Sequence, residues 1–157
     1  MPIDPHSTPA DGDPQAAPLV SRLVQQFGAR WVGQGNHDDF VAGTGTRLLF
    51  LTGDAVRFPE SLDVAVVLPE LQAALRSRPF QIGVVRRVDE DTLARRWGSQ
   101  RWPALVFLRD GQYLATVHGM HDWADYVVRV QQAMDAPPTR APGIGIPVVA
   151  ASGSTCP

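Results

Sequence analysis

The chain has 157 residues, enough for one domain of ordinary size, and its 44% hydrophobic and 19% charged residues are typical of a soluble globular protein. Positive charge comes from 14 arginines without any lysine, against 16 acidic residues, and the two signs balance within residues 19–136. This excludes the basic face that a nucleic-acid-binding protein needs. No apolar run approaches the roughly 18–20 residues that span a bilayer.

Aromatic residues and prolines divide the chain into three parts. All 12 aromatic residues lie between Phe27 and Tyr126, whereas ten of the 14 prolines lie in residues 1–18 and 137–157. Segments of that composition bury too little apolar surface to offset the entropy of ordering. We therefore expect a domain over 19–136 between two disordered tails. The polar, acidic N-terminus has no hydrophobic signal region, which predicts a cytoplasmic protein.

The first third of the domain predicts two helical segments and a strand. Apolar residues recur every three or four positions over 19–29, which indicates an amphipathic helix, and Gly28 suits its end. A short helical turn is expected from residue 36 to residue 40. The continuous apolar run 47–52 is typical of a strand that is covered on both faces.

The middle of the domain predicts a helix, a strand and a second helix. Leucines at steps of three and four favour a helix over 62–75, with Ser61 as its N-cap and Pro69 producing a kink. Residues 80–88 alternate as a central strand does. A short helix over 89–97 has an acidic first turn, as the helix dipole prefers.

The last third predicts a hairpin and a final helix. Residues 104–108 and 113–117 have the pattern of strands, and Asp110-Gly111 between them is a strong hairpin signal. Asp122 is expected to cap a helix that ends near Met134. The complete order describes an α/β protein whose first strands are parallel and whose last pair is antiparallel.

This order resembles the thioredoxin fold at three places. Pro69 corresponds to the kink proline of its first long helix, Trp102-Pro103 to its cis-proline loop, and residues 107–111 to its final hairpin. The resemblance implies a three-layer sandwich with a mixed central sheet, a C-terminal antiparallel hairpin and a cis bond at Pro103. The redox cysteine pair would fall at residues 61–64, which read Ser-Leu-Asp-Val. Because disulfide exchange requires a thiolate, we expect no redox activity.

Longer blocks resemble the HyaE/HoxO/HupG family of nickel–iron hydrogenase maturation proteins, which are thioredoxin-like and lack the cysteines. The resemblance covers about residues 19–135 and is carried by residues 51–54, 59–61, 63–71, 101–111 and 118–126. It implies a cytoplasmic chaperone that holds the hydrogenase small-subunit precursor, whose twin-arginine signal peptide directs export. The alternative is a scaffold subunit of a maturation complex, which contacts other maturation factors and not the signal peptide.

Four residues are the candidate peptide-binding site. The loop before a cis-proline offers backbone groups to an extended peptide, so we expect a groove at Trp102 and Pro103. Trp102 is either an aromatic anchor of that groove or a core residue, and residue types alone do not decide between them. Glu60 and Asp63 are candidate acceptors for the paired arginines, because guanidinium groups pair with carboxylates. The alternative is that both merely favour the dipole of their helix.

Other chemistry finds little support in the sequence. His118 and His121 lie three residues apart beside Asp122, which permits a metal-carrier hypothesis, but the spacing is common and we favour structural or surface roles. Cys156 is the single cysteine, which excludes an internal disulfide and a zinc site built on thiolates. The glycine pairs lack the strand-to-helix context of a phosphate-binding loop. We therefore expect a protein without catalytic residues, bound metal or cofactor.

Overall fold

A computed structural model describes residues 12–143 of the chain. Within them the chain forms five strands, five α-helices and one short 3-10 helix. In chain order these are α1 (Pro18–Phe27), β1 (Arg30–Val32), α2 (His37–Ala42), β2 (Thr46–Leu51), α3 (Glu60–Ala74), β3 (Phe80–Val85), η2 (Arg87–Asp89), α4 (Glu90–Arg96), β4 (Ala104–Arg109), β5 (Gln112–His118) and α5 (Trp123–Asp135).

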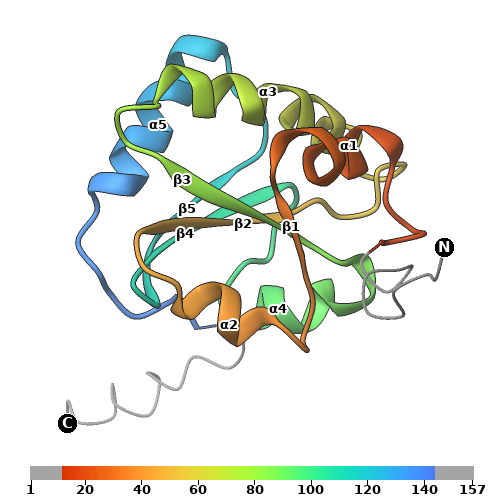
Figure 1. Ribbon diagram of the computed structural model, residues 1–157, viewed down its shortest axis with the longest axis horizontal. Helices are drawn as coiled ribbons and strands as arrows, with labels where there is room; N and C mark the ends of the chain where they lie inside the picture. The colour runs from red at the N-terminus through yellow and green to blue at the C-terminus, as the bar shows by residue number, and fades with distance from the viewer. Residues whose placement is uncertain (1–11, 144–157) are drawn as a thin grey trace, which may run out of the picture.

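One mixed sheet forms the middle layer of the molecule (Figure 1). Its strand order is β1-β3-β2-β4-β5, in which β1, β3 and β2 run parallel and β4 and β5 are each antiparallel to the preceding neighbour. Helices α1, α3 and α5 cover one face, and α2 and α4 cover the other. The predicted three-layer α/β sandwich with a C-terminal antiparallel hairpin is confirmed.

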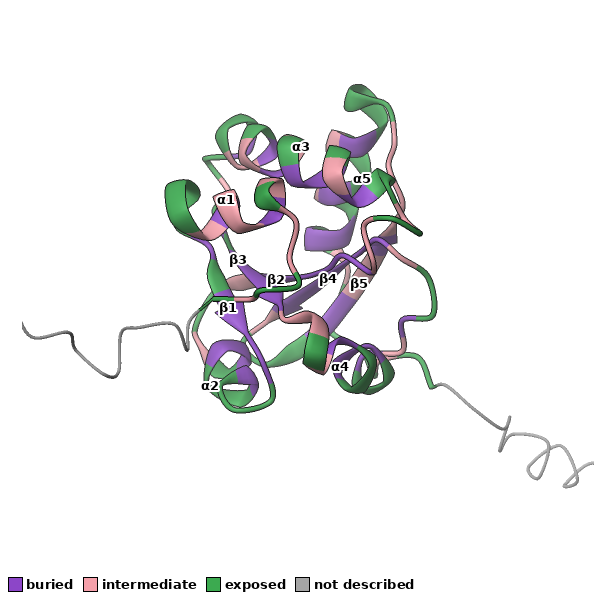
Figure 2. Cartoon of the chain, turned by 90° about the vertical axis from the view of Figure 1, so that its right-hand side faces the viewer, coloured by how far each residue is buried: buried purple, intermediate pink, exposed green. Residues whose placement is uncertain are grey.

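The two faces of the sheet carry separate apolar clusters. Alternate residues of β2 illustrate the division, since Leu48 and Phe50 pack toward α1, α3 and α5 while Leu49 and Leu51 pack toward α2 and α4. All four side chains are buried. The helices turn their buried sides to the sheet and their exposed sides outward (Figure 2). The prediction that β2 is covered on both faces is therefore confirmed.

Some local predictions were wrong. Strand β1 was missed, because three residues are too few to display an alternating pattern. The strand predicted over 80–88 ends at Val85, where the chain turns into the 3-10 helix η2. Ser61 does not cap α3: it is the second residue of the helix, and its buried hydroxyl donates to the carbonyl of Phe58 at 2.8 Å.

Segments outside residues 19–136 also contact the domain. Ala16 and Ala17 pack against the first apolar cluster, and the Asp13 carboxylate accepts a hydrogen bond from the Arg87 amide at 2.8 Å. After α5, the amide of Thr139 donates to the carbonyl of Tyr113 at 2.9 Å. The parts of the expected tails nearest the domain therefore pack on it. The remaining tail residues, including Cys156, lie outside the described residues.

No helix within residues 12–143 is long and apolar enough to cross a membrane.

Candidate functional site

A groove lies where the loop after β2 meets the segment before β4. Gly53 forms its floor with a φ of 69°, a conformation that favours glycine. A Cβ placed on Gly53 would come within 2.7 Å of the Phe58 ring and 2.9 Å of the Cβ of Trp102. The rings of Phe58 and Trp102 face each other with centroids 5.8 Å apart. These contacts enclose a cavity of about 180 Å³.

Trp102 separates this cavity from a second one of about 340 Å³ on the side of α4. The indole is half-buried and packs against the apolar cluster beneath α2 and α4. The indole therefore makes a core contact on one side and forms a cavity wall on the others, while its role as an aromatic anchor for a peptide stays a prediction. Its Nε1 is buried without a hydrogen-bond partner among the described residues. Within residues 12–143 the backbone amide and carbonyl of Trp102 also find no partner.

The bond between Trp102 and Pro103 is cis, as predicted from the thioredoxin-like loop. Pro103 is buried, and its carbonyl accepts a hydrogen bond from the Gly119 amide at 2.8 Å. This bond joins the cis-proline loop to the turn that follows β5. The hydrogen bond to Gly119 thus fixes the loop at Pro103, while the backbone amide and carbonyl of Trp102 remain unpaired within residues 12–143.

Glu60 and Asp63 lie in the first turn of α3 and are both exposed. Oxygen Oε2 of Glu60 would lie 3.8 Å from a Cβ placed on Gly119, so this carboxylate borders the turn that holds the cis-proline loop. Within residues 12–143 neither carboxylate forms an ion pair. The structure thus brings Glu60 near the loop of Pro103 and leaves Asp63 exposed in the same helix turn.

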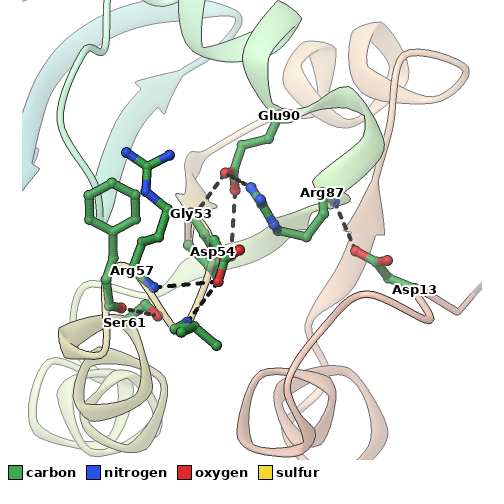
Figure 3. A network of polar contacts seen from close by, with 10 residues as sticks. Asp13, Gly53, Asp54, Arg57, Ser61, Arg87 and Glu90 are labelled. Carbon is green, nitrogen blue, oxygen red and sulfur yellow. Dashed lines mark hydrogen bonds and ion pairs between the residues drawn. The ribbon is translucent and has the colours of Figure 1, made fainter.

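Sequence reasoning missed the main buried charge of this region. Glu90 was expected only as part of the acidic first turn of the helix over 89–97, but its side chain is 1% exposed. Its Oε1 accepts hydrogen bonds from the Gly53 amide at 2.9 Å and from the Arg87 guanidinium at 2.6 Å (Figure 3). Burial raises the pKa of the Glu90 carboxyl, and these two donors oppose that rise. The spacing of Arg87 and Glu90 was the available signal, although it predicts only a surface pair.

The Glu90 network holds the groove in shape. Glu90 fixes the amide of Gly53 at the groove floor, and Arg87 connects Glu90 to Asp13 in the segment before α1. On the opposite side of the loop, Asp54 accepts hydrogen bonds from the amides of Val56 and Arg57, which closes a tight turn (Figure 3). The groove therefore has a rigid floor built from hydrogen bonds to buried and half-buried carboxylates.

The two histidines that suggested a metal site make other contacts. Nε2 of His121 is 2.7 Å from the His118 carbonyl, and its Nδ1 is 3.7 Å from Asp125. Burial, and to a smaller extent the charge of Arg101, lower the pKa of His118. Residues 12–143 contain no group of three His, Cys, Asp or Glu side chains placed to hold a metal ion.

Residues 19–126 match the family described as Hydrogenase-1 expression protein HyaE. The hydrogenase expression/formation protein HoxO of Cupriavidus necator is 53% identical over 142 residues, which cover 88% of each chain. The hydrogenase expression/formation protein HupG of Rhodobacter capsulatus is 36% identical over 135 residues, which cover 84% of this chain and 94% of that one.

Two solved structures are similar to the chain. A putative hydrogenase expression/formation protein HupG from Rhodopseudomonas palustris is 33% identical, with a TM-score of 0.48 over 66% of this chain and 93% of that one. The zinc-bound form of human ERp44 is 14% identical, with a TM-score of 0.53 over 66% of this chain and 29% of that one. At that identity the second likeness concerns the fold alone, which is thioredoxin-like, as predicted.

Proposed function

Since the chain belongs to the HyaE, HoxO and HupG family of hydrogenase expression/formation proteins, we propose that it is a chaperone without redox activity for a nickel–iron hydrogenase small-subunit precursor. It holds this precursor in the cytoplasm before export. The twin-arginine signal peptide of the precursor binds in the groove around Trp102 and Pro103. The protein performs no catalysis and uses no cofactor in this role.

One observation carries the proposal. The backbone amide and carbonyl of Trp102 have no partner among residues 12–143, and they lie beside a cis-proline at the wall of a groove. Unpaired backbone groups of this kind can pair with an extended peptide, which then gains main-chain hydrogen bonds. Ser61 and Val64 occupy the positions where the thioredoxin resemblance places the redox cysteines, so the bound chain meets no thiol there.

The charges near the groove suit a basic peptide. Glu60 and Asp63 are exposed, have no ion-pair partner in the described part of the chain, and occupy one turn of α3 next to the loop of Pro103. A guanidinium forms two parallel hydrogen bonds with such a carboxylate. We assign the two arginines of the signal peptide to Glu60 and Asp63, with the following residues extending along Trp102.

Calorimetric titration with a synthetic small-subunit signal peptide tests the assignment. We expect binding that is lost when both peptide arginines are replaced by glutamine. The double variant Glu60→Gln, Asp63→Asn should weaken binding about tenfold or more, since two charge-assisted contacts are removed. Glu70→Gln is the matched control, because Glu70 is an exposed carboxylate on the same helix and should leave affinity unchanged.

The other outcomes have definite meanings. Equal binding of both peptides would retain the groove and reject the two carboxylates as arginine acceptors. If neither peptide bound, the signal-peptide assignment would be wrong, and the chain would instead be a scaffold subunit that contacts other maturation factors.

A further inference from the structure

The outer edge of β5 carries a second surface, which shares no lining residue with the Trp102 groove. Strand β5 is the last strand of the sheet and lies between α5 and α4 (Figure 2). A cavity of about 340 Å³ opens along it, lined by Ala115–His118 of the strand, by residues of the α5 side and by Arg101.

The backbone groups that face this cavity follow from the hydrogen-bond register. The amide of Gly119 donates to the carbonyl of Pro103. Because hydrogen-bonded pairs alternate along antiparallel strands, the backbone amide and carbonyl of Val117 also point toward β4. Thr116 and His118 then direct their backbone groups outward. The His118 carbonyl lies 2.7 Å from the ring of His121, which leaves the amide and carbonyl of Thr116 and the amide of His118 for another strand.

The start of the same edge already pairs with an extended segment. Thr139 forms an antiparallel bridge with Tyr113, and its amide donates to the Tyr113 carbonyl. Pro137 and Pro138 precede Thr139 and have no amide hydrogen, so the self-pairing stops after one bridge. The remaining edge, from Thr116 to His118, has the same geometry and no strand beside it within residues 12–143.

Two arginines line this edge from opposite faces of the sheet. The cross-strand partners of Thr116 and His118 pack toward α2 and α4, so the side chains of Thr116 and His118 lie on that face of the sheet. Arg101 lies close enough to the His118 side chain to lower its pKa. Arg129 comes from α5, on the other face; its Nε donates to Asp125 at 2.9 Å. Arg101 forms no ion pair with any described residue, and the lining of the cavity contains no carboxylate.

We propose that the outer edge of β5 binds an extended acidic segment of a partner protein, which adds to the sheet as a sixth strand. Successive side chains of a strand point to opposite faces, so two consecutive acidic residues of that segment reach Arg101 and Arg129, one each. The buried Nε2 of His118, which has no partner among the described residues, lies beside the added strand. A second copy of this chain fits poorly, because pairing two β5 edges would bring four arginines together.

The test uses full-length protein and the heptapeptide Thr-Val-Glu-Glu-Val-Thr-Val-amide, which carries fluorescein on its N-terminal amine and is acetylated there in the unlabelled form. We expect saturable binding by anisotropy at low salt, with amide NMR shifts centred on Thr116 and His118. Replacing the two glutamates by glutamines should weaken binding about tenfold, as should the double variant Arg101→Gln, Arg129→Gln. Arg76→Gln is the matched control, because this exposed arginine lies after α3, away from the edge, and should change nothing.

A change in the backbone of the probe peptide distinguishes strand addition from simple charge attraction. A peptide that keeps both glutamates but is N-methylated at alternate residues should lose binding, since it lacks the donors that pair with Thr116. Equal binding of the glutamine or N-methylated peptide, or displacement of the probe by inorganic phosphate at the same concentration as by unlabelled peptide, would overturn the proposal. Sedimentation that shows a dimer of the wild-type chain, with concentration-dependent amide NMR shifts at Thr116 and His118, would assign the edge to a second copy instead.

Discussion

Helices α3 and α4 each begin with a glutamate and each follow a parallel strand of the same sheet, yet the two glutamates differ in every other respect. Glu60 is exposed and unpaired within residues 12–143, whereas Glu90 is 1% exposed and accepts hydrogen bonds from Gly53 and Arg87. The helix dipole favours both equally. The difference teaches that hydrogen bonds tie Glu90 into the groove, while the carboxylate of Glu60 is left exposed, as the proposed peptide contact requires.

The largest expected effect comes from removing the buried carboxylate. Glu90→Ala leaves the Gly53 amide and the Arg87 guanidinium without their acceptor, which should lower the free energy of unfolding by about 2–4 kcal/mol. Urea unfolding measures this. Glu60→Ala is the comparison and should cost less than about 0.5 kcal/mol. Equal losses in the two variants would contradict the distinction between them.

A smaller effect is expected at the groove floor. Gly53→Ala places a methyl group against Phe58 and Trp102 in a backbone conformation that alanine disfavours, which should destabilise the protein by about 1–2 kcal/mol. Gly35→Ala is the control, since no atom lies within 4 Å of its added Cβ. Tryptophan fluorescence should change only in Gly53→Ala, because that substitution displaces Trp102. Unchanged fluorescence and stability would show that Glu90 has no rigid loop to support.

The pH dependence of stability sharpens the comparison further. Burial raises the pKa of Glu90, so above the pKa of an unfolded glutamate, about 4.3, the folded chain keeps a proton that the unfolded chain has lost. The stability of the wild type relative to Glu90→Gln should therefore be greatest below about pH 4 and fall as the pH rises through the folded-state pKa of Glu90. Urea unfolding from pH 4 to pH 8 measures the difference, and a constant or rising value would contradict the burial argument.

The smallest stability effect is expected at the exposed carboxylates. Glu60→Gln, Asp63→Asn should change the free energy of unfolding by no more than about 0.5 kcal/mol, because both side chains are exposed and only weaken a dipole interaction. The same double variant is the one expected to lose signal-peptide affinity. A loss of stability above about 2 kcal/mol would mean that these residues support the fold, and the contrast with Glu90 would disappear.

Several features could be predicted because they depend on local sequence. The long helix with Pro69 inside it, the strand β2 and the Asp110-Gly111 hairpin each show in the spacing of apolar residues and in turn chemistry. The cis bond at Pro103 followed from resemblance and not from spacing. Strand β1 and the early end of β3 escaped, since a three-residue strand has no period and Val88 continues an apolar pattern after the chain has already turned into η2.

For the candidate peptide-binding site, the sequence alone determined that two carboxylates occupy one segment and a tryptophan and a proline another. It also determined that the site has no cysteine pair. Only the tertiary structure decided that Glu60 borders the loop of Pro103, that Trp102 both packs inward and lines a cavity, and that Glu90 is buried. The physical reason is how far apart along the chain the contacting residues lie. Spacing along the chain reports contacts within one helix or strand, whereas the burial of a charge depends on segments that the sheet brings together from positions far apart, here Gly53 and Glu90.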